Sequence, residues 1–339
     1  MLTHEETLAK ISQIAQQVRH LRDLLDRGYS SRELELKARA AELVRLRRGW
    51  YVPATFWRTL HAEDQQLALV HAIGSSASAA PVFSHLSAAA LHGLPLHDKM
   101  DATAHVITPP GNAGNASRSL KRHRVQLDHS EVMRVGPYLC TTPERTILDL
   151  ALTAPTPWAL SIADAYLRHN FRVERHIDET SVADWRDRLR ESADQRSGQR
   201  GVRTARWIAA NADPRADSPL ESMSRYHLDR LGFRVSIQVP VPARYGGYYY
   251  LDFDFEGLNV FGECDGKYKY TDPALLGGKS AAERVYTDKR RTDWIEATIQ
   301  KRPIHWGWPD VDTTRRFGLQ LRAFGVPIPA KGMLLLGQV

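Results

Sequence analysis

The chain has 339 residues, and its 42% hydrophobic and 25% charged content is ordinary for a soluble globular protein of two or three domains. No apolar run reaches the roughly 18 residues that cross a bilayer, which excludes helical membrane proteins and a membrane partner. The net charge of +7 favours a polyanionic partner, while the polar first residues and two distant cysteines indicate a cytoplasmic protein without a disulfide framework.

The first fifty residues predict helical segments followed by a β-ribbon. Apolar residues recur at helical spacing from Leu8 to Leu25, and Gly28 ends this stretch. The segment "SSRELELKARAAEL" follows, with Ser30 and Glu33 at the spacing of a capping box. "LVRLRRGWYVP" then places alternating apolar and basic residues before aromatic ones, as in the wing of a winged helix-turn-helix.

This order of elements predicts that the last helix enters the DNA major groove while the wing contacts the phosphate backbone. Between residues 19 and 48, nine Lys and Arg residues stand against five Asp and Glu residues, so this segment carries +4 of the net charge. We expect DNA contacts from Arg32, Lys37, Arg39, Arg45, Arg47 and Arg48. The alternative interpretation is a small helical domain with a solvated basic face.

Residues 54–212 mix short strands and helices and predict an α/β middle domain. Ser84 opens a helix, "AHVIT" is a strand, and Thr142 with Pro143 begins another helix. Four histidines match no ligand or catalytic spacing and are interpreted as structural: His85, His92, His123 and His129. A second basic cluster extends the expected DNA contacts: Arg118, Lys121, Arg122 and Arg124.

Four pieces of the chain are together similar to the AbiEi antitoxin family of type IV toxin–antitoxin systems. They are "LRRGWYVP", "SHLSAAALHGLPL", "RHRVQL" and "TTPERTILDLA". The resemblance implies a DNA-binding antitoxin that represses its own promoter and has a cognate toxin as a partner.

A polar segment with prolines, "NADPRADSP", predicts a domain boundary, so that the expected domains are residues 1–53, 54–212 and 213–339. In the last domain a helix, "SPLESMSRYHLDRLG", precedes the strands "FRVSIQVPV", "YYLDFDF" and "LNVFGECDG". A long helix and a strand, "RPIHWGWP", follow. The fold class predicted for the whole chain is therefore a multidomain α+β protein, with the order αβββαβ in its C-terminal domain.

Acidic residues gather in two of these strands. A hairpin at Glu256-Gly257 brings Asp252 near Glu263 on adjacent antiparallel strands, and Asp265 follows. Carboxylate oxygens are the ligands that Mg²⁺ prefers, and a bound metal lowers the pKa of its water. We expect a Mg²⁺ or Mn²⁺ site whose ligands are Asp252, Glu263 and Asp265.

The same residues and element order resemble the PD-(D/E)XK nuclease fold, and more closely its branch related to very-short-patch-repair (Vsr) endonucleases. The matching pieces are "ES" at 221–222, "LDFDF", "GECDGKYKY" and "DKRRTD". The resemblance implies a Mg²⁺-dependent endonuclease in which Lys267 orients the attacking water or stabilises developing charge. The usual ending E-x-K is shifted here, because Asp265 precedes the lysine, so either Lys267 or Lys269 takes that role.

Two further roles are open. Glu221 is either a distant metal ligand or the partner of Ser218 in a capping box. Substrate phosphates are expected to contact the second helix of this domain at Lys289, Arg290 and Arg291.

Two functions follow from these patterns. The first is a DNA endonuclease that a winged helix delivers to double-stranded DNA. The alternative is a non-cleaving AbiEi-type antitoxin or transcriptional repressor with a degenerate nuclease-fold module. The carboxylates favour the nuclease, because without a metal they repel DNA. An RNA substrate, stacked on the tyrosines at 248–250, is the weakest of the alternatives.

Overall fold

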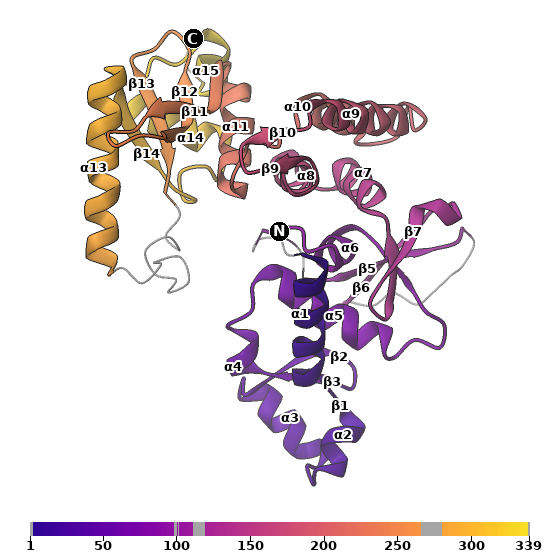
Figure 1. Ribbon diagram of the computed structural model, residues 1–339. Helices are drawn as coiled ribbons and strands as arrows, with labels where there is room; N and C mark the ends of the chain where they lie inside the picture. Colours follow the sequence, from indigo (N-terminus) through magenta and orange to yellow (C-terminus); the bar gives the residue numbers. More distant parts are fainter. Residues whose placement is uncertain (1–2, 98–99, 101, 111–118, 266–279, 338–339) are drawn as a thin grey trace. The chain divides into compact units, whose positions relative to one another are not determined.

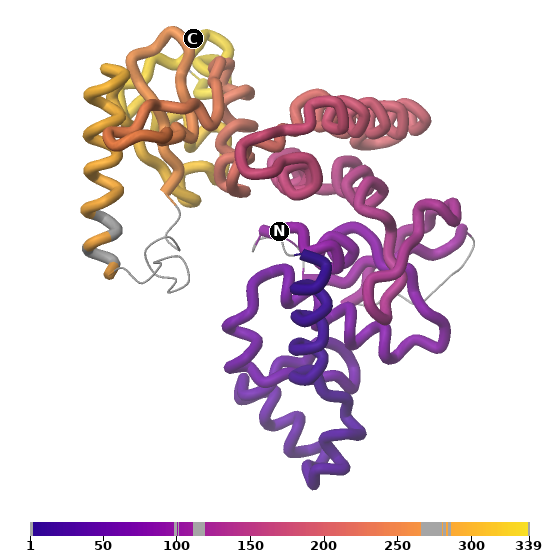
Figure 2. Tube along the Cα trace, in the orientation of Figure 1, coloured from indigo at the N-terminus to yellow at the C-terminus, as the bar shows by residue number. Residues whose placement is uncertain are grey.

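The structure is a computed structural model that describes residues 3–97, 100, 102–110, 119–265 and 280–337 (Figures 1 and 2). It is an α+β protein with several separate sheets, as expected. The chain forms two compact units: unit 1 is Met1–Asn170 with Asp178–Ala212, and unit 2 is Phe171–Ile177 with Asp213–Val339. The separate domain expected to end at residue 53 stays a prediction. Across the described residues, every helix is too short or too polar to traverse a lipid bilayer.

Unit 1 opens with three helices and a three-stranded sheet of order β1-β3-β2. These elements are α1 (His4–Gln17), β1 (Arg19–His20), α2 (Leu21–Asp26), α3 (Ser31–Arg39), β2 (Leu43–Arg47) and β3 (Trp50–Pro53). The capping box predicted at the start of α3 is confirmed, because Ser30 Oγ accepts from Glu33 N–H at 3.2 Å while Ser30 N–H donates to Glu33 Oε2 at 2.7 Å.

The continuous helical stretch predicted over residues 8–25 is wrong. Helix α1 ends at Gln17, and Val18 has extended backbone with a buried side chain. His20 then caps α2, its Nδ1 accepting from Arg22 N–H at 3.3 Å. The apolar residues on the two sides of this break pack in different clusters, Ile11, Ile14 and Val18 in one and Leu24 in another.

The rest of unit 1 surrounds a five-stranded sheet of order β6-β5-β4-β8-β7. Its elements are α4 (Ala54–Trp57), α5 (Ala62–Gly74), β4 (Val82–Phe83), α6 (His85–Leu91), β5 (Ala104–Thr108), β6 (Leu120–Arg124), a 3-10 turn (His129–Glu131), β7 (Val132–Val135), β8 (Tyr138–Thr141), α7 (Pro143–Thr153), α8 (Thr156–Phe171), α9 (Glu179–Asp194) and α10 (Val202–Asn211). Thr142 caps α7 as predicted. The fully buried Phe83 and Cys140 mark the core between this sheet and its helices.

Unit 2 has the predicted order of helix, three strands, helix and strand. Its elements are β9 (Arg172–Val173), β10 (His176–Ile177), α11 (Pro219–Leu231), β11 (Val235–Pro242), β12 (Tyr248–Phe255), β13 (Val260–Cys264), α13 (Ala281–Ile299), β14 (Arg302–Trp306), α14 (Thr314–Ala323) and α15 (Ala330–Leu335). The main sheet has the order β11-β12-β13-β14, and only β14 is parallel to its neighbour (Figure 1). As predicted, Ser218 caps α11 and Gly232 ends it with a φ of 85°.

The core of unit 2 fixes strand β13, which carries the central acidic residues. Trp306 from β14 lies against Gly262, where an added Cβ would come within 2.1 Å of the Trp306 ring atom Cη2. The same indole donates from Nε1 to Ser224 Oγ at 2.8 Å. Glycine is therefore required at position 262 for Trp306 to pack there, directly beside Glu263.

Candidate functional site

A row of ionisable residues crosses three neighbouring strands of unit 2. Continuing the antiparallel register of β12 and β13 by one residue sets Asp252 beside Glu263. The parallel register of β13 and β14 then pairs Glu263 with His305. The Cys264 N–H donates to Asp252 Oδ2 at 2.7 Å, which fixes the Asp252 carboxylate to β13.

Glu221, at the start of α11, brings a third carboxylate to this row. Ser218 Oγ donates to Glu221 Oε1 at 2.9 Å, and Glu221 N–H donates to Ser218 Oγ at 3.2 Å, so the predicted pairing of these two residues is confirmed, although the backbone N–H that the Glu221 carboxylate accepts is that of Asp217 and not that of Ser218. The other oxygen, Oε2, accepts from the Asp217 N–H and from Gln238 Nε2, each at 2.9 Å. These contacts turn a buried carboxylate toward β11, where no partner was predicted.

We call Glu221, Asp252 and Glu263 the carboxylate cluster. Burial raises the pKa of both Glu221 and Glu263 to about 7, and the negative charge of Asp252 contributes to both shifts. Both side chains are buried, with 6% of each residue exposed. Buried carboxylates that lie close together repel one another, which raises their pKa values. Protonation or a bound cation relieves this repulsion.

Arg291 of α13 partly offsets this repulsion. Its Nη1 donates to Glu263 Oε2 at 3.1 Å, and its Nη2 donates to the Tyr250 carbonyl oxygen. Arg291 therefore holds Glu263 in place, whereas the sequence predicts for it a contact with DNA. Lys289 and Arg290 on the same helix are exposed, and their phosphate contacts stay predictions.

The remaining predicted residues fall into separate environments. Asp265 Oδ2 lies 3.0 Å from Nδ1 of His305, and this hydrogen bond raises the pKa of His305. Asp254, which shares a strand with Asp252, forms an ion pair with Lys301. The two candidate lysines, Lys267 and Lys269, lie outside the described residues.

A hairpin distant in sequence supplies basic groups that sequence reasoning missed. Arg172 and Arg175, from the β9–β10 hairpin, both pair with Asp217, the latter at 3.2 Å. Arg175 also donates to Gln238 Oε1 at 2.8 Å and lies 4.1 Å from the Tyr250 ring centroid. Gln238 thus links a half-exposed arginine to Glu221. The local sequence pattern gives no sign of these contacts, because α9 and α10 separate the hairpin from the rest of unit 2 along the sequence.

The basic residues predicted for DNA contact in unit 1 lie mostly at the surface. The exposed ones are Arg32, Arg39, Arg45, Arg48 and Arg124. Lys37 is paired with Glu42 at 2.6 Å. Burial lowers the pKa of Arg47, and the positive charge of Arg122 lowers it further, so the wing and β6 are electrostatic neighbours. Arg118 lies outside the described residues.

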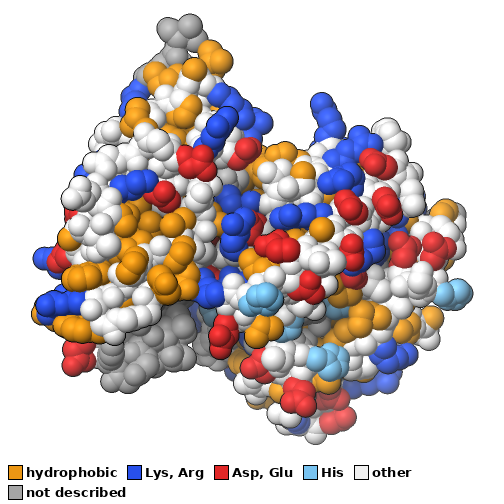
Figure 3. Space-filling view, turned by 45° about the horizontal axis from the view of Figure 1, so that its top comes forward, with side chains coloured by type: hydrophobic (Ala, Val, Ile, Leu, Met, Phe, Trp, Pro, Cys, Tyr) orange, Lys and Arg blue, Asp and Glu red, His pale blue; other side chains and the backbone are white. Residues whose placement is uncertain are grey.

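One face of the molecule shows a mixed surface charge (Figure 3). On the face drawn in Figure 3, Lys and Arg side chains are interspersed with Asp and Glu side chains. The DNA contacts expected on unit 1 therefore rest on the local basic elements already named, rather than on the net charge of the chain.

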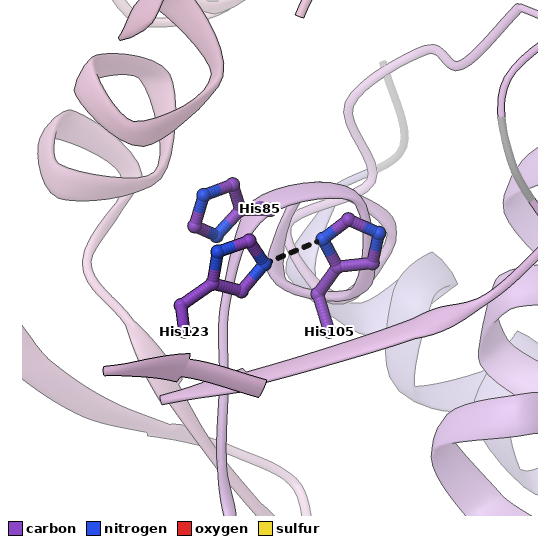
Figure 4. Close-up of side chains that lie close together, drawn as sticks. All are labelled: His85, His105 and His123. Atoms are coloured by element: carbon purple, nitrogen blue, oxygen red, sulfur yellow. Dashed lines mark hydrogen bonds between the residues drawn. The ribbon is translucent and has the colours of Figure 1, made fainter. Parts of the chain in front are cut away.

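Three histidines of unit 1 lie together, although sequence spacing did not relate them. They are His85 at the start of α6, His105 in β5 and His123 in β6 (Figure 4). Burial lowers the pKa of His85 and His123, the latter to about 4, and the charge of Lys121 contributes to both shifts. His92 lies apart from them, with its Nε2 2.7 Å from the Thr141 carbonyl oxygen, and His129 is exposed.

Comparison with known proteins gives a distant similarity. No protein-family model matches the chain. Two curated proteins of Mycobacterium tuberculosis, "Uncharacterized protein MT2308" of strain CDC 1551 / Oshkosh and "Uncharacterized protein Rv2248" of strain ATCC 25618 / H37Rv, are each 28% identical over 191 residues. The match covers 56% of this chain and 64% of each relative, so the chain spans less than two thirds of their length. The resemblances to AbiEi antitoxins and Vsr-like nucleases stay predictions.

Proposed function

We propose that unit 2 is a Mg²⁺- or Mn²⁺-dependent DNA endonuclease domain of the PD-(D/E)XK type and that unit 1 binds double-stranded DNA. The observation that carries this proposal is the carboxylate cluster, whose two glutamates have pKa values raised by burial and by Asp252. Acidic residues gathered despite their mutual repulsion are typical of a site that works with a cation. The order αβββαβ around the cluster agrees with the proposal.

Carboxylate oxygens are the ligand type that a hard divalent cation prefers, although among the described residues only His85, His105 and His123 bring three ligand atoms within 4.8 Å of one another. Asp252 and Glu263 would hold such a cation with carboxylate oxygens, and Asp265 would add a third carboxylate only with the oxygen that its hydrogen bond to His305 leaves free. When bound, the cation lowers the pKa of a water molecule and neutralises charge on the phosphate. Arg291 keeps the Glu263 carboxylate oriented.

The chain's own residues supply the other groups that phosphodiester hydrolysis requires. His305, whose pKa the hydrogen bond to Asp265 raises, is paired in register with Glu263 and would serve as a proton donor to a phosphate or leaving oxygen. Arg175 pairs with Asp217 and is linked through Gln238 to Glu221, and in this proposal it would contact a substrate phosphate. The role of the general base or water-orienting amine is left to Lys267 or Lys269.

The test uses the full chain with supercoiled plasmid DNA in the presence of Mg²⁺ or Mn²⁺. We expect nicking or linearisation that a chelator stops. Glu263→Gln and Asp252→Asn should each lower the rate more than about 100-fold, because removing a ligand takes away several kcal/mol of stabilisation. Glu256→Gln, which changes an exposed carboxylate at the β12–β13 hairpin, should leave the rate unchanged.

Two outcomes would contradict the proposal. Cleavage that survives both site substitutions places the reaction elsewhere. Binding to DNA without cleavage under either cation supports instead the non-cleaving antitoxin or repressor, in which unit 2 is a degenerate module. A gel-shift measurement on the same variants separates an effect on cutting from an effect on binding.

A further inference from the structure

The histidine cluster of unit 1, His85, His105 and His123, has the dimensions of a metal site. One ring nitrogen from each residue lies within 4.8 Å of the other two. His105 Nδ1 and His123 Nε2 are 3.0 Å apart (Figure 4). Zn–N distances of about 2.0–2.1 Å place tetrahedral ligands roughly 3.3 Å from one another, so this pair is already near the required spacing.

The third ring needs one movement. His85 is stacked on His123, with 3.5 Å between ring centroids and 13° between ring planes. The lone pairs of two parallel rings do not converge on one point, so the His85 ring has to turn out of the stack to share a metal. His85 Nδ1 faces Ser84 Oγ at 3.0 Å, which leaves Nε2 as its ligand atom.

A buried carboxylate beside the cluster is the second observation. Among the described residues, Asp149 Oδ2 has no hydrogen-bond partner, although only 5% of the residue is exposed. This oxygen lies 4.0 Å from His85 Nδ1, and the other oxygen accepts from Arg145 Nε at 2.9 Å. Metal-binding histidines commonly turn their second ring nitrogen toward a carboxylate, which fixes the tautomer and strengthens the ligand.

We propose that His85, His105 and His123 form a Zn²⁺ site in unit 1, with Asp149 as the carboxylate that orients His85. Three imidazoles suit Zn²⁺ and related transition-metal ions, whereas Mg²⁺ requires oxygen ligands. The site joins three elements, because His85 begins α6 and the other two lie on β5 and β6. It fastens β6, the edge strand of the five-stranded sheet, to the core. Strand β6 also carries Arg122 and Arg124. The role proposed for the ion is structural support of a basic edge.

The experiment is a Zn²⁺ titration of the full chain after chelation and dialysis, in excess Mg²⁺ so that carboxylate sites are occupied. We expect one equivalent of Zn²⁺ to bind and the melting temperature to rise by several degrees. Co²⁺ in place of Zn²⁺ should give the visible absorption of a tetrahedral site. His105→Ala and His123→Ala should lower the affinity more than about 100-fold, and Asp149→Asn about 10–100-fold.

The matched control is His92→Gln, which changes a half-buried histidine of the same unit and keeps a donor for the Thr141 carbonyl. This variant should bind Zn²⁺ as the parent does, and so should Glu263→Gln in unit 2. Circular dichroism of each variant without metal shows whether it is folded. His123→Ala is the decisive variant should His105→Ala fail to fold, because His123 is only half buried. The proposal is overturned if the parent takes up no Zn²⁺, or if folded His123→Ala binds it with unchanged affinity and absorption.

Discussion

The carboxylate cluster of unit 2 and the histidine cluster of unit 1 are both built from buried ionisable groups, but burial acts on them in opposite directions. It raises the pKa of Glu221 and Glu263, and it lowers that of His85 and His123. In both cases desolvation disfavours the charged form. Burial therefore favours protonated glutamates in the first cluster and neutral imidazoles in the second. Under the two proposals above, the clusters would take different metals, although the same physical effect acts on both.

The arginines beside the two clusters differ in how deeply they are buried. Arg145 is buried with Asp149, with 4% and 6% of their side chains exposed, and it also binds Glu131 at 2.8 Å. Arg291 leaves 28% of its side chain exposed where it meets Glu263. The first arginine is part of a core, and the second lies at the border of a site that solvent reaches.

The largest expected effect comes from removing Arg145. Arg145→Ala removes the ion pairs with both Asp149 and Glu131 from a buried position and should cost up to about 3–5 kcal/mol of unfolding free energy, less where Asp149, whose pKa burial raises to about 6, takes up a proton. Arg291→Ala should cost roughly 1 kcal/mol, because its ion pair is partly exposed and Glu263 can take up a proton. Urea unfolding measures both values. Equal decreases for the two variants would show that the two arginines do not differ as their burial indicates.

Opposite responses to pH are the next expected effect. In unit 1 the histidines bind protons more readily when unfolded, so their contribution to stability should fall as the pH drops from 6.5 towards 4, partly offset by Asp149, whose pKa burial raises to about 6. In unit 2 the two glutamates hold protons more tightly when folded, so their stabilising contribution is present below pH 4.5 and disappears as the pH rises through about 7. Peptide-resolved hydrogen exchange in urea at pH 5 and pH 8 follows the units separately.

A double variant sharpens this prediction. Glu221→Gln with Glu263→Gln removes the two glutamates and should reduce the loss of stability of unit 2 between pH 5 and pH 8 while leaving the pH dependence of unit 1 intact. His227, whose pKa burial lowers to about 4, and His305, whose pKa Asp265 raises, still titrate in this variant. Added Mg²⁺ should stabilise unit 2 of the parent more at pH 8 than at pH 5, because protons compete with the cation. The same direction of response in both units would contradict the contrast between the clusters.

Local signals predicted the framework of unit 2 but only part of its site. Ser218, Pro219 and Gly232 set the ends of α11 through caps that lie within a few residues, and strand alternation placed Asp252 and Glu263 correctly. Lys301 pairing with Asp254 was not predicted, because the two residues are 47 positions apart.

Pairings between distant segments explain the other misses. His105 and His123 come together only because β5 and β6 pair in parallel, and a residue spacing of 18 has no periodicity that indicates this. Arg175 donates a hydrogen bond to Gln238, although two helices of unit 1 lie between these residues in the sequence. The break in the first helix at Val18 depends on the pairing of β1 with a strand about thirty residues later. Such pairings are fixed by tertiary packing, which the local pattern does not contain.

The smallest expected effect separates binding in unit 1 from chemistry in unit 2. Arg47→Ala with Arg48→Ala should weaken DNA binding and reduce its log–log salt dependence by about one unit for each phosphate that the protein no longer neutralises. Arg122→Ala should add to this effect, because its charge already acts on Arg47. Arg203→Ala, at an exposed position on α10, is the control and should leave the slope unchanged. Fluorescence anisotropy over a range of salt concentrations measures each slope. A slope that stays constant in the wing variant removes β2 and β3 from the DNA interface, and the basic edge at β6 then becomes the surface to test alone.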